Sequence, residues 1–331
     1  MKTSERGIKR IYLLGAIILL VLIIVYALNV GSISMKISDM LKGIFSNSDV
    51  DGNLSIIKEI RVPRVFSAVL IGANLAVAGV LLQAVIRNPL ADPYITGISS
   101  GASLITVIIM MFIPSIKASR PLFGFIGGAI SCTLVYAFAF KKELSAIRIV
   151  LVGAATNALF GGITSLITSN SGIAGNSINR WLSGSLATIK VSDLKILLIY
   201  TVIGMIGAFL LSRSCDLLSL GKKNARSLGI NPDFHMIIIT GVAVFLSSIS
   251  TSIGGVISFI GLVVPHMCRI IIGSEHKYLI PFSAVMGGIL LLLADTLGRA
   301  IMKQVEIPVG IIMSVIGAPF FLYLLRRSDL R

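Results

Sequence analysis

The chain has 331 residues, of which 55% are hydrophobic and only 13% are charged. A soluble domain carries roughly 25% charged residues, so this composition excludes an ordinary soluble protein. The net charge of +15 does not indicate a nucleic-acid partner. Lys and Arg stand in short clusters at the ends of apolar runs, where they face membrane lipids and fix topology. We therefore expect a membrane protein that binds no nucleic acid.

Apolar runs long enough to cross the hydrocarbon core of a bilayer recur from one end of the chain to the other. They predict an all-α integral membrane protein with transmembrane helices at 11–28, 65–86, 97–113, 121–140, 147–168, 194–212, 236–253, 256–272, 279–301 and 307–325. The run at 256–272 is the weakest of these, because glycines and a proline interrupt it. No polar gap is long enough for a soluble domain, so we expect 1–331 to be one transmembrane domain with 11–325 embedded in the membrane.

Basic residues set the expected topology. The N-terminus carries Lys2, Arg6, Lys9 and Arg10, and the positive-inside rule places it in the cytoplasm. The first apolar run resembles a signal peptide, but no Ala-x-Ala site follows it, so we expect a retained first span. An even number of spans then places the C-terminus in the cytoplasm as well. The bias is modest, because basic residues also occur in the outer segment 36–64.

Residues 61–101 are the most informative stretch of the sequence. They begin with two arginines, continue with apolar and small residues for the thickness of a bilayer, and end in the turn RNPLADP at 87–93. Irregular backbone at membrane depth is tolerated only where it is buried in protein or lines a cavity. A second interruption at 254–265 pairs with the one at 89–101, a weak indication of a transporter built from inverted repeats. The pattern favours a protein that moves something across a membrane.

Five short motifs occur along the chain, and their combination is far more specific than any one of them. They are RVPR at 61–64, RNPLADP at 87–93, LGKKNARSLG at 220–229, SFIGLVVPH at 258–266 and PVGIIMSVIGAP at 308–319. Together they resemble the FecCD/BtuC-type permease family over about residues 10–325. Members of that family are the transmembrane subunits of ATP-binding-cassette (ABC) importers for iron-siderophores, haem and cobalamin.

The resemblance implies a BtuC-like, type II importer fold in the bacterial cytoplasmic membrane, working by alternating access. It implies three partners: ABC ATPase subunits inside, an extracytoplasmic substrate-binding protein outside, and a second copy of this permease or a sister permease. The chain contains no G-x-x-x-x-G-K-[ST] loop. We therefore expect a transport subunit that is not an enzyme and holds no cofactor, with ATP-Mg bound by the partner ATPase.

The expected cargo is an iron chelate, either a ferric siderophore or haem. Cobalamin is the alternative within the same family. A secondary transporter driven by an ion gradient is a further alternative, but it needs carboxylates along its path, and the spans offer almost none beyond Asp295. No metal site is predicted, because the three cysteines lack pair or ligand spacing.

The loop at 214–235 matches the family's coupling element, which the ATPase grips. We expect Asp216 to cap a short helix that Gly221 ends, and a second short helix to stop at Gly229. Leucine side chains and Ala225 would supply apolar contact, and basic side chains would meet an acidic rim. The alternative is a solvated basic loop that only obeys the positive-inside rule. The predicted coupling residues are Asp216, Leu217, Leu218, Leu220, Gly221, Lys222, Lys223, Ala225, Arg226, Leu228 and Gly229.

Three arginines match the positions at which the family docks its binding protein through glutamates: Arg61, Arg64 and Arg299. Arginine suits this role because its planar guanidinium binds carboxylates in a bidentate manner. The alternative is that each arginine is an end anchor that reaches the lipid headgroups. Asp295 stands four residues before Arg299, and we expect the two to form an i,i+4 pair.

Asn88 and Leu90 match the family's constriction at the cytoplasmic end of the path. A second part of the gate is expected at Ser145, Ala146 and Ile147, where Ala146 and Ile147 replace the hydroxyl residues found in other members. An apolar ring can still close a path by dewetting. The path itself is expected along the fifth span, where polar residues interrupt an apolar helix; hydrogen bonding between helices explains them equally well. These residues are Asn157, Thr164, Ser165 and Thr168.

Overall fold

The computed structural model describes residues 2–29, 57–139, 146–169, 172–301 and 306–327. All regular structure within these ranges is helical, which confirms the predicted all-α fold. The elements are α1 (Lys2–Asn29), η1 (Ile57–Arg61), α4 (Val62–Ile86), α5 (Ile98–Phe112), η2 (Pro114–Ser119), α6 (Arg120–Ala139), α7 (Ala146–Ser169), α8 (Gly172–Leu182), α9 (Val191–Leu210), α10 (Ser212–Ser219), α11 (Lys222–Ser227), α12 (Pro232–Gly254), α13 (Ile260–Ile272), α14 (His276–Ile301) and α15 (Val309–Arg327).

Each of the ten predicted membrane spans overlaps one of the described helices, and α8, α10 and α11 are further, short helices. Seven are long and apolar enough to cross a membrane, namely α1, α4, α6, α7, α9, α12 and α14, and α5, α13 and α15 contain shorter apolar stretches. One predicted boundary is wrong, because α13 begins only at Ile260. Residues 255–259 are not helical, and Phe259 has a positive φ of 69°. The chain is a multi-pass membrane protein.

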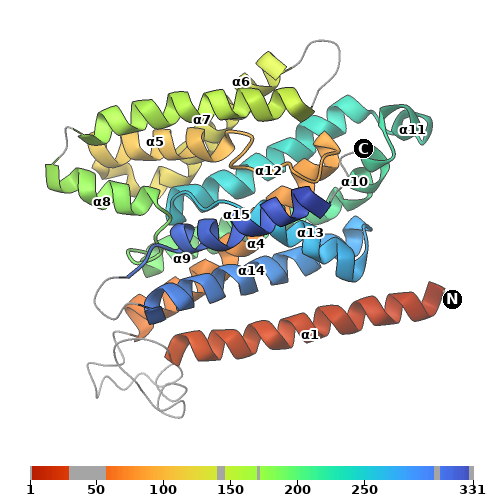
Figure 1. The fold of residues 1–331 in the computed structure, drawn as a ribbon, viewed down its shortest axis with the longest axis horizontal. Coiled ribbons are helices and arrows are strands. Elements are labelled where there is room, and N and C mark those ends of the chain that lie inside the picture. Colours follow the sequence, from red (N-terminus) through yellow and green to blue (C-terminus); the bar gives the residue numbers. More distant parts are fainter. Residues whose placement is uncertain (1, 30–56, 140–145, 170–171, 302–305, 328–331) are drawn as a thin grey trace.

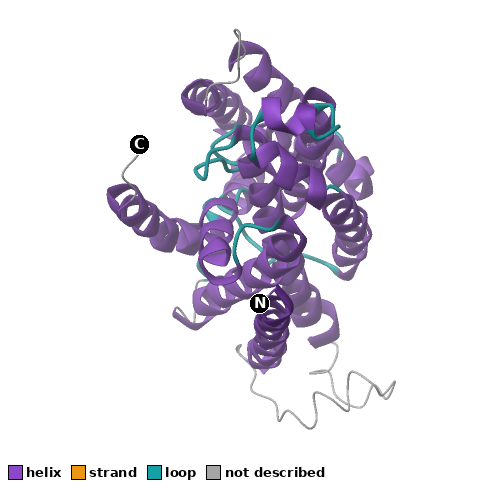
Figure 2. Cartoon of the chain, turned by 90° about the vertical axis from the view of Figure 1, so that its right-hand side faces the viewer, coloured by secondary structure: helices purple, strands orange, loops and turns teal. Residues whose placement is uncertain are grey.

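Helix α4 is the centre of the bundle. It packs against α9, α12, α13 and α14, and 83% of its most apolar window is buried, against 17% for α1 at the edge. In Figure 1, α1 runs beside α14 at one side of the bundle, while α5 to α8 form the opposite side. Figure 2 shows the N-terminal and C-terminal helices at the periphery. The other helices therefore surround α4, the most apolar of the helices that carry one of the five sequence motifs.

Small residues allow α4 and α14 to approach closely. A Cβ atom added to Gly72 would collide with the backbone carbonyl of Gly287, so neither position has room for a side chain. Helices in lipid associate through such van der Waals contact, because the surrounding lipid is as apolar as the helices. This close packing positions Arg64 near the start of α4 against Asp295 near the end of α14.

Candidate functional site

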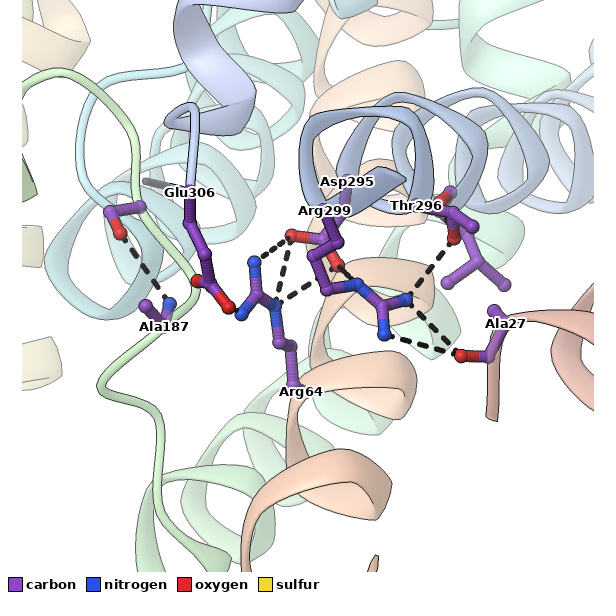
Figure 3. Close-up of polar contacts among 9 residues, drawn as sticks. Ala27, Arg64, Ala187, Asp295, Thr296, Arg299 and Glu306 are labelled. Atoms are coloured by element: carbon purple, nitrogen blue, oxygen red, sulfur yellow. Dashed lines mark hydrogen bonds and ion pairs between the residues drawn. The ribbon is translucent and has the colours of Figure 1, made fainter. Parts of the chain in front are cut away.

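At one end of the bundle, charged side chains, most of them buried, meet in a network that we call the outer arginine cluster. It consists of Arg61, Arg64, Asp295, Arg299 and Glu306, and Figure 3 labels the last four of these residues. Nη2 of Arg64 in α4 donates to Oδ1 of Asp295 in α14 at 2.9 Å, and its Nε lies 3.1 Å from both carboxylate oxygens. Nε of Arg299 lies 3.2 Å from Oδ2 of the same aspartate. One buried carboxylate therefore holds two guanidinium groups.

Backbone carbonyls of α1 and a second carboxylate complete the cluster. Arg299 donates to the carbonyl oxygen of Ala27 at 3.2 Å, and Arg61 donates to that of Leu28 at 3.0 Å. Glu306, just before α15, accepts from Nη1 of Arg64 at 2.7 Å. The cluster thus ties α1, α4, α14 and the segment before α15 together.

The structure brings together the three arginines that were predicted to dock a binding protein. The i,i+4 pair of Asp295 and Arg299 is confirmed. Nothing in the sequence indicated that Arg64 shares the same aspartate, since the two residues are 231 positions apart, and Glu306 was not predicted. All three arginines form internal contacts and are at least half buried, which neither the docking nor the lipid-anchor interpretation foresaw. Their docking role stays a prediction.

At the other end, α10 and α11 form a compact turn that we call the elbow, residues 212–229. Gly221 separates the two helices with a φ of 99°, a conformation that favours glycine. Helix α11 ends at Ser227, before Gly229, whose φ is also positive. The two predicted short helices and their glycine boundaries are confirmed. Asn231 then caps α12 by accepting from the amides of Asp233 and Phe234.

Three details of the predicted elbow are wrong. Asp216 does not cap the start of the short helix, because it lies inside α10; its Oδ1 instead accepts from the backbone amide of His276, the first residue of α14, at 2.9 Å. Leu218 and Ala225 offer no apolar surface to a partner, because both are buried in the core of this chain. Their burial instead fixes the shape of the elbow. Leu220 and Leu228 remain exposed, at 57% and 55%, and can make such a contact.

The elbow is bonded directly to the long helix α14. Nδ1 of His276 lies 2.6 Å from Oδ1 of Asp216, and His276 is buried as the first residue of α14. The same helix carries Asp295 and Arg299 near its other end. One helix therefore contacts both the elbow and the outer arginine cluster.

The predicted gate residues lie in the turn 87–97, between α4 and α5. Arg87 ends α4 in the left-handed region, with a φ of 54°. Oδ1 of Asn88 then accepts from the amide of Leu90 at 2.8 Å, which closes a tight turn. Both Asn88 and Leu90 are half buried. The two interruptions foreseen in the sequence meet here, because Nε2 of Gln83 donates to the carbonyls of Ala91 and Gly261.

Asp92 is the buried carboxyl group of this turn. Its Oδ1 accepts from the backbone amides of Tyr94, at 2.7 Å, and Ile95, at 3.4 Å. Burial raises the pKa of Asp92 to about 6, and the two amide hydrogen bonds oppose that rise. Asp92 was not among the predicted site residues, although it lies inside the RNPLADP motif.

The elbow and the turn lie next to each other. They line a cavity of about 570 Å³, with Arg87, Asn88 and Pro89 on one side and Asp216, Leu217 and Leu220 on the other. A Cβ atom at Gly221 would stand 3.2 Å from Nη1 of Arg87. The structure therefore places the predicted coupling element against the predicted gate.

The polar residues of α7 have separate environments. Nδ2 of Asn157 donates to the carbonyl of Tyr94 at 2.9 Å. This bond joins two segments of the chain, as expected if the polar residues of this helix serve hydrogen bonding and not the path. Thr164 and Thr168 donate to carbonyls of their own helix, and Ser165 is exposed.

Of the second part of the gate, the structure places only one side chain. Ser145 lies outside the described residues, and Ala146 is described as the first residue of α7 without its side chain. Ile147 is 73% exposed. The apolar residue at this position is therefore available to a path or a partner. Among the described residues, no group of His, Cys, Asp or Glu could hold a metal ion.

The fold and the two ends of the bundle define a class of protein, the permease of an ABC importer with a BtuC-like fold. A solved structure described as an inward-facing conformation of a metal-chelate type ABC transporter is similar to the chain, with a TM-score of 0.79 and 30% identity over 95% of this chain and 98% of that one. The profile of the FecCD transport family matches residues 18–327. The chain belongs to the FecCD transport family.

Curated relatives match over nearly their full lengths. The chain is 38% identical over 302 residues to the "Fe(3+)-citrate import system permease protein YfmD" of Bacillus subtilis, which covers 91% of this chain and 90% of that protein. It is 36% identical over 324 residues to the "Probable heme-iron transport system permease protein IsdF" of Staphylococcus aureus, covering 97% of each. These relatives are permease subunits, which fits a transport role for the chain.

Proposed function

We propose that this chain is the permease subunit of an ABC importer that carries an iron chelate, a ferric siderophore or haem, across the bacterial cytoplasmic membrane. The observation that carries the proposal is the likeness, over nine-tenths or more of the chain, to permeases named for ferric citrate and for heme iron. The cargo passes by alternating access, in which the path opens to one side of the membrane at a time.

The energy comes from a partner ATPase that grips the elbow, and both chain termini lie on that cytoplasmic side. Leu220 and Leu228 offer exposed apolar contacts there, and Lys223 and Arg226 are exposed basic side chains beside them. Such a surface suits a partner with an apolar cleft and an acidic rim. ATP-Mg is bound by the ATPase, and this chain holds no cofactor of its own.

The path runs between two permeases, either two copies of this chain or this chain and a sister permease. Helices α7 and α15 carry large apolar side chains that the chain itself does not cover, among them Leu151, Leu166, Val315 and Leu322. Ser165 is the exposed polar residue of α7 that faces the path, and Asn88 and Leu90 form its cytoplasmic constriction. The extracytoplasmic binding protein docks at the outer arginine cluster.

Reconstitution tests the proposal. The chain, its ATPase and its binding protein are placed in proteoliposomes, and ATP-dependent uptake is measured for ferric citrate, a ferric hydroxamate, haem and cobalamin. We expect uptake of one of the iron chelates and no uptake of cobalamin. Uptake of cobalamin alone would assign the importer to the alternative cargo of the family.

A further inference from the structure

A pocket of about 240 Å³ lies beside the outer arginine cluster. Its charged lining consists of Arg64, Arg180 and Glu306, and Ile307, Pro308 and Val309 form its apolar wall. In Figure 3, Glu306 and Asp295 approach the guanidinium of Arg64 from different directions. This pocket adjoins the proposed docking site but contains two residues, Arg180 and Glu306, that no sequence motif marked.

The two carboxylates on Arg64 differ in how firmly they are held. The side chain of Asp295 is 1% exposed and binds Arg64 through both of its oxygens. The side chain of Glu306 is 51% exposed and contacts Arg64 through one oxygen. A half-exposed carboxylate gains back its hydration when it leaves, and Arg64 keeps its contacts with both oxygens of Asp295 after that departure. Glu306 is therefore the exchangeable partner.

Arg180 gives a second positive group in the same pocket. It lies near the end of α8, is exposed, and has no ion-pair partner among the described residues. Among the described residues, the pocket and the cluster together contain four guanidinium groups, from Arg61, Arg64, Arg180 and Arg299, and two carboxylates, from Asp295 and Glu306. A further carboxylate that enters the pocket meets a net positive charge and a planar donor on each side.

We propose that Glu306 is an internal substitute for an acidic side chain of the docking binding protein. The incoming glutamate or aspartate replaces Glu306 on Nη1 of Arg64 and is held from the other side by Arg180. This inference rests on the proposed function and adds to it a specific exchange of carboxylates. The binding protein therefore docks less tightly than it would if Arg64 were not occupied by Glu306, because each docking event must first displace Glu306.

Glu306→Gln tests the exchange. The affinity of the purified binding protein that supports uptake is measured on nanodiscs containing the chain and its ATPase. We expect about fivefold tighter docking, the size typical of one exposed ion pair. Glu59→Gln is the matched control, because Glu59 is an exposed glutamate of η1, close in sequence to Arg61, that has no contact with Arg64. It removes the same charge, and we expect less than about a twofold change.

Arg180→Glu is the second variant, and we expect it to weaken docking about fivefold or more. Equal affinities for Glu306→Gln and Glu59→Gln, or weaker docking by Glu306→Gln, would overturn the exchange. The affinity of free citrate is measured on the same variants. If Glu306→Gln binds citrate more tightly but not the binding protein, the assignment of the pocket to a protein carboxylate is overturned. If the wild-type chain does not bind the binding protein at all, both the proposed docking and this inference fail. If the wild-type chain binds it but Glu306→Gln does not bind it more tightly, only this inference fails.

Discussion

Two aspartates at opposite ends of the molecule each hold two basic side chains, and the comparison shows what burial changes. Asp295, in the outer arginine cluster, binds Arg64 and Arg299 with its side chain 1% exposed. Asp233, beside the elbow, binds Lys222 and Arg226 with its side chain 60% exposed. The first network is fixed inside the protein and joins distant segments. The second is solvated and local, so it is free to rearrange around a partner.

The largest effect is expected from Asp295→Ala. This change leaves Arg64 and Arg299 buried without their shared carboxylate, which costs about 3–5 kcal/mol of folding stability. Thermal unfolding of the purified chain in detergent measures the loss. A variant that also replaces both arginines with Met should recover much of that stability, because a buried charge network exchanged for apolar groups is often neutral. A fully stable single variant would show that the cluster is hydrated, contrary to the structure.

Gly72→Ala tests the close packing that brings the cluster together. The added methyl group meets the backbone of Gly287, so α4 and α14 must separate at a cost of about 1–3 kcal/mol. Gly241→Ala in α12 is the control, because no atom lies within 4 Å of a Cβ at that position. We expect the control to be neutral or slightly stabilising, and equal melting temperatures of the two variants would contradict the packing.

Asp92→Asn tests the buried carboxyl group of the turn between α4 and α5. A carboxyl with a pKa of about 6 in the folded chain and about 4 when unfolded binds its proton more tightly when folded. The contribution of Asp92 to folding stability is therefore greatest below pH 4 and falls by about 2–3 kcal/mol as the pH rises through 6. The amide cannot ionise, so the melting temperature of the variant should rise relative to that of the wild type between pH 4 and 7. A difference in melting temperature that stays constant over this range would contradict the assignment.

The smallest effect is expected from Asp233→Ala, the counterpart of the first variant. An exposed pair is screened by water and salt, so the loss should be about 1 kcal/mol or less. Unfolding at low and high ionic strength measures it, and most of the effect should vanish at high salt. A loss as large as that of Asp295→Ala would remove the distinction between the two ends.

The same contrast explains what the sequence could predict. The elbow follows from local signals, because Gly221, Gly229 and the Asn231-Pro232 pair mark where short helices end. The pairing of Asp295 and Arg299 follows from helical spacing. The bond from Arg64 to Asp295 joins residues 231 positions apart, so only the packing of α4 on α14 determines it. The burial of Leu218 has the same origin, since it depends on how α10 packs against α4 and α14.

The central claim is that this chain is a passive conduit whose energy comes from a separate ATPase bound at the elbow. Uptake against a gradient is measured in proteoliposomes that contain the chain and binding protein alone, with the ATPase, or with an ATPase unable to hydrolyse ATP. The account predicts accumulation of the iron chelate only with the active ATPase, and its loss when Leu220 and Leu228 are replaced with Asp. Accumulation by the chain without any ATPase would contradict the account.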